Sequence, residues 1–236
     1  MAIKKWYSFA ENGAYTGPEA AFFDVSQKQW AKMLEENHPL ILEEFRKIIA
    51  GDQKDIIPYY NETLASKAEN WTIFPLYNWG IKKKSNCEKC PETTKILESI
   101  PGMTNCLFSI LKPGTAIKPH YGDSNVMYRC HLTLRSPGLL PEIGMRVKDQ
   151  TTSWEAGRLI AFCDAHEHEV WNHTKEERWV LIVDVLREEF ENDRKKICAE
   201  INATLWWQFK FQKSNLLWKV PRWGRKALLK ATSWFF

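Results

Sequence analysis

The hydrophobic pattern changes near Gly102, from helical spacing before it to alternation after it. In residues 37–51 apolar side chains recur at the spacing of one helix face, and Pro39 suits the first turn of that helix. A second helix is predicted from Pro91 to the turn before Gly102. Because the stretch between these two helices shows little periodicity, we expect residues 1–101 to form a helical and irregular region that packs on the rest.

Apolar stretches after Gly102 predict β-strands. They read CLFSIL (106–111), MYRCHLTLR (127–135), RLIAFCD (158–164) and RWVLIVDVL (178–186). Within 127–135 the residues alternate, so that Arg129, His131 and Thr133 share one face and Cys130, Leu132 and Leu134 share the other. Such a polar face either lies inward and binds an anion or faces solvent on an open sheet. Strands joined by turns without helices between them favour an antiparallel sandwich or barrel.

The C-terminal segment differs in composition from the rest of the chain, which is otherwise typical of a globular protein at 44% hydrophobic and 26% charged residues. Residues 205–236 hold seven Lys and Arg, five of the twelve Trp and no acid. We therefore treat residues 188–236 as a basic, Trp-rich helical tail. This composition is typical of an interfacial element on an anionic membrane, or of a basic helix packed on the barrel by its tryptophans. We expect no nucleic-acid partner.

The other global features indicate a reducing compartment. No apolar run is as long as a membrane span, and the N-terminus lacks the apolar segment of a signal peptide, so we expect a cytoplasmic protein. A peripheral position on the inner face of a membrane is the alternative that the tail suggests. The six cysteines lack a disulfide-like spacing. Cys87 and Cys90 alone have metal-like spacing, and we interpret them as two thiols before a helix because a structural zinc needs four ligands.

The candidate chemistry centres on histidines. Three of the six lie in the stretch AHEHEVWNHT: His166, His168 and His173. His120 lies in KPHYGDSN, and the strand between these stretches carries Arg129 and His131. Two imidazoles brought together across a small barrel would suit a borderline metal. The usual non-haem iron triad would place a carboxylate two residues after the first histidine, but Gly122 stands there.

Five blocks in order resemble the aspartyl/asparaginyl β-hydroxylases, a branch of the Fe(II)/2-oxoglutarate dioxygenases, over roughly residues 75–187. The blocks read FSILKPGTAIKPHYGDSN, YRCHLTL, WEAG, FCDAHEHEVWN and ERWVLIVDV. The resemblance implies a jelly-roll core, a double-stranded β-helix over residues 102–187, flanked by helices. It also implies an enzyme that hydroxylates an unactivated C–H bond with Fe(II) and 2-oxoglutarate as cofactors.

The resemblance further implies the metal ligands. In this family two histidines hold the iron, and solvent takes the place of the carboxylate, so Gly122 fits the pattern. The matching ligands are His120 and His168. His166 occupies a variable position, expected to line the approach or to face solvent, and His173 is expected to be structural or exposed.

The cosubstrate residues follow from the same resemblance. A guanidinium at Arg178 would bind the far carboxylate of 2-oxoglutarate in bidentate fashion. Ser109 and His131 would be hydrogen-bond partners, and Arg129 a cation shared between the cosubstrate and substrate pockets. Asp164 is expected to be an acceptor near the metal-bound histidines or a turn residue.

The substrate class stays open at this point. Family members hydroxylate Asp or Asn side chains of peptides, whereas related bacterial branches hydroxylate lipid acyl chains or free amino acids. The peptide-directed enzymes carry a substrate-binding arginine two positions before Arg129, where this chain has Met127. We expect a hydroxylase of peptide Asp or Asn side chains, with a membrane-surface lipid acyl-chain hydroxylase as the alternative that Met127 favours and a non-catalytic binding barrel as the alternative of another class.

Overall fold

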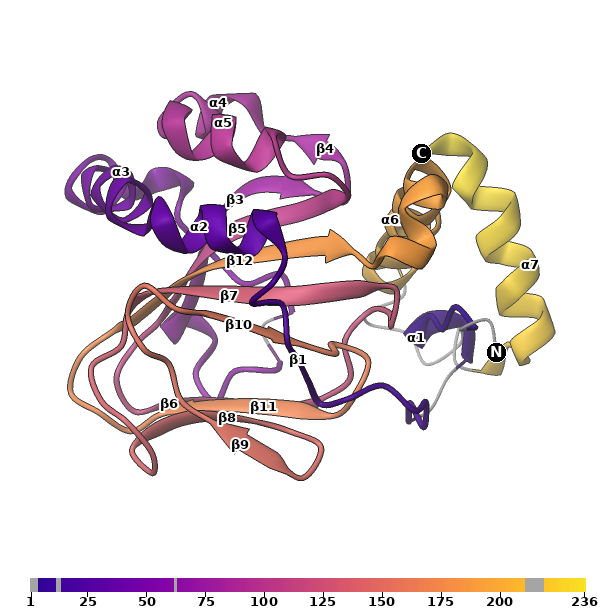
Figure 1. The fold of residues 1–236 in the computed structure, drawn as a ribbon. Coiled ribbons are helices and arrows are strands. Elements are labelled where there is room, and N and C mark those ends of the chain that lie inside the picture. Colours follow the sequence, from indigo (N-terminus) through magenta and orange to yellow (C-terminus); the bar gives the residue numbers. More distant parts are fainter. Residues whose placement is uncertain (1–3, 12–13, 62, 211–218) are drawn as a thin grey trace.

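Two antiparallel sheets form the centre of the computed structural model, which describes residues 4–11, 14–61, 63–210 and 219–236 (Figure 1). The larger sheet consists, in spatial order, of β1 (Phe22–Phe23), β10 (Leu159–Phe162), β7 (Met127–Arg135), β12 (Arg178–Leu186), β5 (Met103–Leu111), β3 (Trp71–Asn78) and β2 (Ile57–Pro58), with β4 (Ile81–Lys82) also paired to β3. The smaller sheet consists of β6 (Thr115–His120), β11 (His168–Asn172), β8 (Ile143–Val147) and β9 (Gln150–Thr152).

The chain alternates between the two sheets from β5 onwards. Strands β5, β7, β10 and β12 belong to the larger sheet, and β6, β8, β9 and β11 to the smaller one. This order, with β10-β7-β12-β5 facing β6-β11-β8-β9, is that of a double-stranded β-helix. The predicted fold, mainly β with flanking helices around a jelly-roll core, is confirmed.

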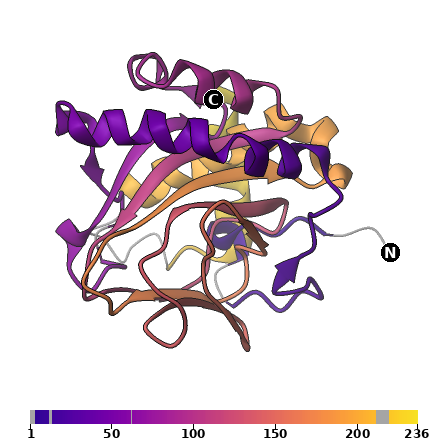
Figure 2. The ribbon, with the colours of Figure 1, turned by 60° about the vertical axis from the view of Figure 1, so that its left-hand side comes forward.

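Helices cover the outer face of the larger sheet and one end of the barrel (Figures 1 and 2). The helices are α1 (Ser8–Glu11), α2 (Gln29–Glu36), α3 (His38–Ala50), α4 (Lys84–Cys87), α5 (Pro91–Glu98), α6 (Arg194–Lys210) and α7 (Arg222–Thr232). Short 3-10 segments are η1 (Gln53–Asp55), η2 (Ala68–Asn70), η3 (Glu188–Asp193) and η5 (Ser233–Phe235). None of the helices in the described part of the chain has the length and apolar character needed to cross a bilayer.

The larger sheet is buried on both faces, which explains its nearly continuous apolar strands. Leu132 of β7 and Phe108 of β5 belong to the cluster under α2 and α3, where Phe108 stacks on Phe45 at 4.3 Å between ring centroids. Alternate residues face the barrel interior, and there His131 and Thr133 are 5% and 0% exposed. The alternative of a solvent-facing polar strand is therefore wrong.

The first 101 residues supply strands as well as helices. The two predicted helices are confirmed as α3 and α5. The stretch between them also contains β3, whose residues Trp71–Tyr77 pair with β5. Near the N-terminus, β1 pairs with β10 of the core. Hydrogen bonds of the larger sheet join residues on the two sides of the expected boundary at residues 101–102. The division into separate regions at that boundary stays a prediction.

Candidate functional site

Two neighbouring strands of the smaller sheet bring His120 and His168 together. His120 ends β6 and His168 begins β11, and the strand register makes the two residues direct partners. Their ring centroids lie 4.2 Å apart. Both histidines lie within strands, at the same end of the barrel, rather than in the loops on either side.

Hydrogen bonds fix the orientation of both rings. The Nδ1 of His120 lies 2.8 Å from the carbonyl oxygen of Lys118, and the Nδ1 of His168 lies 2.9 Å from that of His166. A carbonyl oxygen accepts only, so Nδ1 carries the proton and the lone pair resides on Nε2. Burial lowers the pKa of both histidines, which favours neutral rings. Each ring is thus prepared to bind a metal through Nε2.

Asp164 lies beside the pair. Its Oδ1 is 3.7 Å from the Nε2 of His168 and also accepts a hydrogen bond from Arg129, while its Oδ2 accepts one from the backbone N–H of Asp123 at 2.9 Å. These contacts agree with the acceptor role expected for Asp164. A Cβ added to Gly122 would lie 1.8 Å from Asp164 Oδ2, so a side chain at position 122 has no room beside this carboxylate.

The two histidines are the candidate metal ligands that the described ranges offer at this place. Across those ranges no group of three or more His, Cys, Asp or Glu is arranged to hold a metal. The donor set therefore fits a metal bound by two imidazoles and completed by small molecules. Iron of the non-haem type accepts imidazole nitrogen and leaves such positions open to oxygen-donor ligands.

Arg129 is fully engaged with carboxylates. Its Nε and Nη2 donate to the two oxygens of Asp184, each at 2.8 Å, and its Nη1 donates to Asp164. Both acids are completely buried. Asn105 adds a hydrogen bond to Asp184 at 2.9 Å. This end of the barrel is accordingly rich in charge, and its cation has partners on all sides.

Arg178, at the start of β12, is a buried cation without an acidic partner in the described residues. It is 1% exposed, and its Nη2 donates to the hydroxyl of Ser109 at 3.2 Å, while its Nε has no partner. Its guanidinium lies over the ring of Trp154 at 4.9 Å. Burial lowers the pKa of Arg178 to about 9, so it remains charged at neutral pH. A buried charge of this kind is costly unless an anion joins it.

A row of rings connects the histidine pair with Arg178 inside the barrel. His168 contacts Phe162 at 5.3 Å, Phe162 contacts His131 at 5.1 Å, and His131 stacks on Trp154 at 6.3 Å. Two buried polar atoms along this row, His131 Nδ1 and Trp154 Nε1, lack hydrogen-bond partners. Together with Arg178 Nε, they leave unused hydrogen-bonding capacity suited to a carboxylate ligand.

The two remaining histidines of the AHEHEVWNHT stretch lie outside this row. His166 is 2% exposed, and its Nε2 lies 2.8 Å from the carbonyl oxygen of Glu19. Of its two expected roles, facing solvent is wrong, because the N-terminal segment covers it, and lining the approach stays a prediction. His173 is exposed, as predicted, in the turn after β11.

Sequence reasoning missed several partners of the site. Trp71 donates a hydrogen bond from Nε1 to Ser109 at 3.1 Å, and Tyr59 stacks on Trp71 at 3.7 Å. Both come from the stretch without periodicity. Asp184 was counted only as part of an apolar strand. Its alternation with Ile182 and Val180 was the signal that could have placed it inside the barrel.

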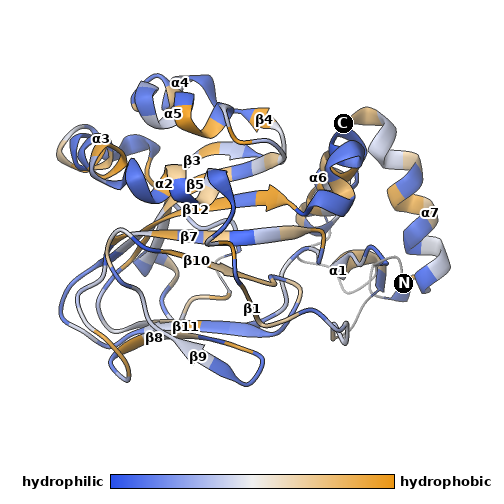
Figure 3. Ribbon diagram, viewed as in Figure 1, coloured by the Kyte–Doolittle hydropathy of each residue, from blue (hydrophilic) through white to orange (hydrophobic). Residues whose placement is uncertain are grey.

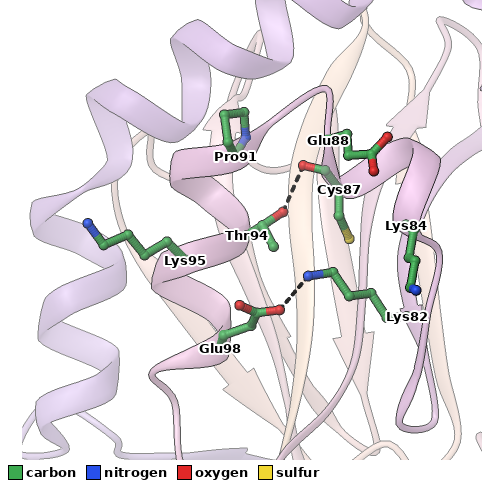
Figure 4. A pocket seen from close by; sticks show the side chains of 8 residues that line it. All are labelled: Lys82, Lys84, Cys87, Glu88, Pro91, Thr94, Lys95 and Glu98. Carbon is green, nitrogen blue, oxygen red and sulfur yellow. Dashed lines mark hydrogen bonds and ion pairs between the residues drawn. The ribbon is translucent and has the colours of Figure 1, made fainter.

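A surface hollow of about 320 Å³ lies away from this site, between β4, α4 and α5 (Figure 4). Its lining residues are Lys82, Lys84, Cys87, Glu88, Pro91, Thr94, Lys95 and Glu98. Lys82 is already paired with Glu98 at 2.6 Å, and Thr94 donates to the carbonyl oxygen of Cys87. None of the histidines or arginines described above contributes to it.

The family model for aspartyl/asparaginyl beta-hydroxylase matches residues 35–188, which include both histidines, Arg129 and Arg178. The chain belongs to the aspartyl/asparaginyl β-hydroxylase family. The family assignment from the sequence blocks is confirmed, and with it membership in a family of hydroxylases.

Relatives in this family differ in their named substrates. The chain is 33% identical over 170 residues to an ornithine lipid ester-linked acyl 2-hydroxylase of Rhizobium tropici, with 70% of this chain and 60% of the relative aligned. It is 30% identical over 192 residues to the human aspartyl/asparaginyl beta-hydroxylase, with 78% of this chain and 24% of the relative aligned. The chain thus spans between a quarter and three fifths of the length of these relatives.

Solved structures match more distantly. A prolyl hydroxylase from Trichoplax adhaerens, in complex with a peptide fragment of hypoxia inducible factor, covers 72% of this chain and 96% of its own at 11% identity and a TM-score of 0.46. A Pseudomonas putida prolyl-4-hydroxylase covers 68% of this chain and all of its own at 18% identity and a TM-score of 0.44. The fold assignment rests on the strand order given above.

Proposed function

We propose that this protein is an Fe(II)- and 2-oxoglutarate-dependent dioxygenase that hydroxylates an unactivated C–H bond. The observation that carries the proposal is the buried Arg178, which has no acid partner among the described residues and shares one barrel with a neutral histidine pair. A buried cation of this kind is stabilised by an anionic ligand. A dicarboxylate can meet this requirement with one end and reach a metal with the other.

We assign the site residues the following roles. His120 and His168 would hold iron through Nε2, and Arg178 with Ser109 would bind the far carboxylate of 2-oxoglutarate. His131, with its unpaired Nδ1, is a hydrogen-bond partner for the same ligand. When bound, iron and 2-oxoglutarate supply the oxidation, in which O2, 2-oxoglutarate and R–H give R–OH, succinate and CO2.

For Arg129 we propose a structural role, and the expected role as a cation shared between the cosubstrate and substrate pockets stays an untested prediction. Its guanidinium is paired with Asp164 and Asp184, so its charge is balanced before any substrate arrives. We assign it the task of holding Asp164 beside His168. The chain's own residues thereby orient the ligands and shield them from water, while the cofactors carry the chemistry.

A lipid acyl chain is the substrate class that we favour over a peptide Asp or Asn side chain. Met127, at the position where peptide-directed relatives carry a substrate-binding arginine, is completely buried in an apolar cluster with Leu186, Phe190 and Ile197. A thioether there cannot pair with a substrate carboxylate. The lipid hydroxylase relative supports the same choice.

A lipid substrate implies contact with a membrane, which we propose to be peripheral and made through residues 205–236. Five of the seven cations of this segment are exposed in the part that the structure describes: Lys210, Lys219, Arg222, Lys226 and Lys230. Lys213 and Trp218 lie outside the described residues. We propose an intracellular location on the inner membrane face, where anionic lipids give the surface its negative charge.

The test is turnover of 2-oxoglutarate by the purified full chain. Addition of 2-oxoglutarate under anaerobic conditions to the Fe(II)-loaded protein should give a visible charge-transfer absorption band, and oxygen should then release succinate. Vesicles of a bacterial lipid extract and an Asp-containing peptide, supplied separately, should be distinguished by the mass of the hydroxylated product. Absence of both the absorption band and succinate would leave the non-catalytic barrel as the better account.

A further inference from the structure

The helix α7 has one face that packs on the protein. Leu229 is 6% exposed and lies in a cluster with Phe9 and Ala10 of α1 and Ala203 of α6. On α6, Trp207 donates from Nε1 to the hydroxyl of Thr232 at 3.1 Å. Part of the tail is therefore anchored by apolar packing of Leu229 on α1 and α6, whereas the packed-helix alternative expected tryptophans to pack on the barrel.

The opposite face of α7 and the adjoining η5 carry exposed aromatic side chains. Trp223 is 76% exposed, and Trp234 and Phe235 are 87% and 85% exposed. Trp223 lies in the first turn of α7, and Trp234 and Phe235 lie in η5, so exposed aromatic side chains are found at both ends of the helix. Large aromatic side chains in contact with solvent are typical of an interaction surface.

Cations accompany these aromatics. Arg222, Lys226 and Lys230 recur every four residues along α7, and Lys219 lies just before it. Lys226 pairs with Glu11 of α1 at 2.7 Å, whereas residues 205–236 contain no acid of their own. Figure 3 shows the resulting mixture of hydrophilic and hydrophobic residues along α7. We define the α7 face by Lys219, Arg222, Trp223, Lys230, Trp234 and Phe235.

The α7 face lies near the histidine end of the barrel. α1 contacts α7, and the backbone N–H of Ser8 in α1 donates to the carbonyl oxygen of Asp123 at 3.0 Å. Asp123 follows His120 by three residues, and its own N–H donates to Asp164. Figure 1 shows α1 between this end of the barrel and α7. The α7 face therefore lies at the same end of the molecule as the proposed metal ligands, with α1 between α7 and the barrel.

We infer that the α7 face docks on an anionic lipid bilayer and holds the histidine end of the barrel at headgroup level. Positive charge selects an anionic surface, and Trp and Phe beside the charges suit the interface between headgroups and acyl chains. The docking itself is independent of the enzyme's chemistry. Only the delivery of an acyl chain to the histidines rests on the proposed function.

The test compares two charge-reversal variants in the full chain. The first carries Lys219→Glu, Arg222→Glu and Lys230→Glu. The control carries Lys32→Glu, Arg46→Glu and Lys95→Glu on α2, α3 and α5, which changes the net charge equally on another layer of the molecule. These positions are all exposed. Point variants are preferable to truncation, because removal of Leu229 would expose Phe9 and Ala203.

Sedimentation with vesicles should separate the two variants. The wild type and the control should bind phosphatidylglycerol-rich vesicles, and the α7-face variant should bind at least ~30-fold more weakly, since each cation near such a surface contributes ~1 kcal/mol. High salt should weaken wild-type binding. Trp223→Ala with Trp234→Ala should weaken binding ~10-fold or more at an unchanged melting temperature.

Other outcomes would overturn the inference. Equal binding to phosphatidylcholine vesicles, or equal loss in the control variant, would mean that the α7 face does not recognise anionic lipid. A dimer in the absence of vesicles that the Trp pair abolishes would mean that a second copy of the chain covers this face. Because succinate release without substrate does not require the membrane, it measures the proposed function separately from the docking.

Discussion

The two ends of the barrel interior each hold an arginine, partly buried Arg129 and fully buried Arg178, in opposite electrostatic states. Near the histidine pair, Arg129 is held by Asp164 and Asp184, so that charges of both signs are present. At the start of β12, Arg178 has a hydroxyl and an aromatic face as neighbours and no acid among the described residues. Both side chains lie on the inward face of the larger sheet.

The difference supports a structural role for Arg129 and the proposed anion-binding role for Arg178. An ion pair that is complete within the protein fixes geometry, and removing one partner leaves a buried charge. A buried cation without an acidic partner makes the free energy of folding less favourable, and a bound anion can offset this. The partners of the two arginines therefore distinguish them more sharply than their exposed fractions do.

The largest expected effect comes from removing the proposed metal ligands, which lie at the end of the barrel where Arg129 is paired with acids. We expect His120→Ala and His168→Ala each to reduce iron-dependent succinate release to background, because one imidazole cannot hold the metal. His173→Ala, in the same stretch but exposed, is the matched control and should retain turnover. Metal content and succinate release measure both effects. Loss of iron in His173→Ala together with retention of iron in His168→Ala would mean that His173, and not His168, is the ligand.

The next effect concerns stability. Arg129→Met should lower the free energy of unfolding by about 3–5 kcal/mol, because it leaves two buried carboxylates without their cation. Arg178→Met should leave the unfolding free energy unchanged or raise it, since it removes a buried charge that has no acid partner. Urea denaturation of the two variants without 2-oxoglutarate tests the contrast. A large loss in Arg178→Met would show that Arg178 already has a stabilising partner.

The third effect concerns the ligand. Arg178→Met should weaken 2-oxoglutarate binding to the metal-loaded protein by about 2–5 kcal/mol, the cost of truncating one side of a desolvated charge pair. Arg178→Lys should recover part of this loss, because it restores charge without the bidentate geometry. Calorimetric titration measures the affinities. Unchanged affinity in Arg178→Met would refute the assignment of this anion site.

The smallest effect concerns the thermal response to the ligand. Saturating 2-oxoglutarate should raise the melting temperature of the wild type, because a ligand that binds only the folded state stabilises it. The same addition should leave Arg178→Met nearly unaffected, while His173→Ala should respond as the wild type does. A thermal shift of wild-type size in Arg178→Met would place the anion elsewhere in the barrel.

The strand alternation around His131 was sufficient to predict the strand and its polar face, but it left open whether that face lies inward or faces solvent. The pattern failed at β3, because WTIFPLYN is buried on both faces and has no alternation to reveal it. It also failed at the edge strand β6, because the polar residues and proline in Lys118, Pro119 and His120 are typical of a loop. Strand β11, which begins at His168, was not predicted either, so both histidines lie in strands that the pattern did not predict.

The sequence supplied the proposed ligand-binding residues but not the side-chain contacts that they make. Family blocks supplied His120, His168 and Arg178, and the structure brings the two histidines together. The partners of Arg129 could not be read from the sequence, since Asp164 and Asp184 are 35 and 55 residues away along the chain. Such contacts depend on strand register, which a single sequence specifies only through the completed fold.

The close approach of Gly122 to Asp164 has an evolutionary consequence. A β-carbon at position 122 would overlap the Asp164 carboxylate, so a side chain at that position requires this carboxylate to move. Such a movement would disturb a partner of Arg129 and the neighbour of His168. Under the proposed function, a third protein ligand at position 122 would therefore need compensating changes elsewhere, and we expect the two-histidine arrangement to persist even as substrates diverge.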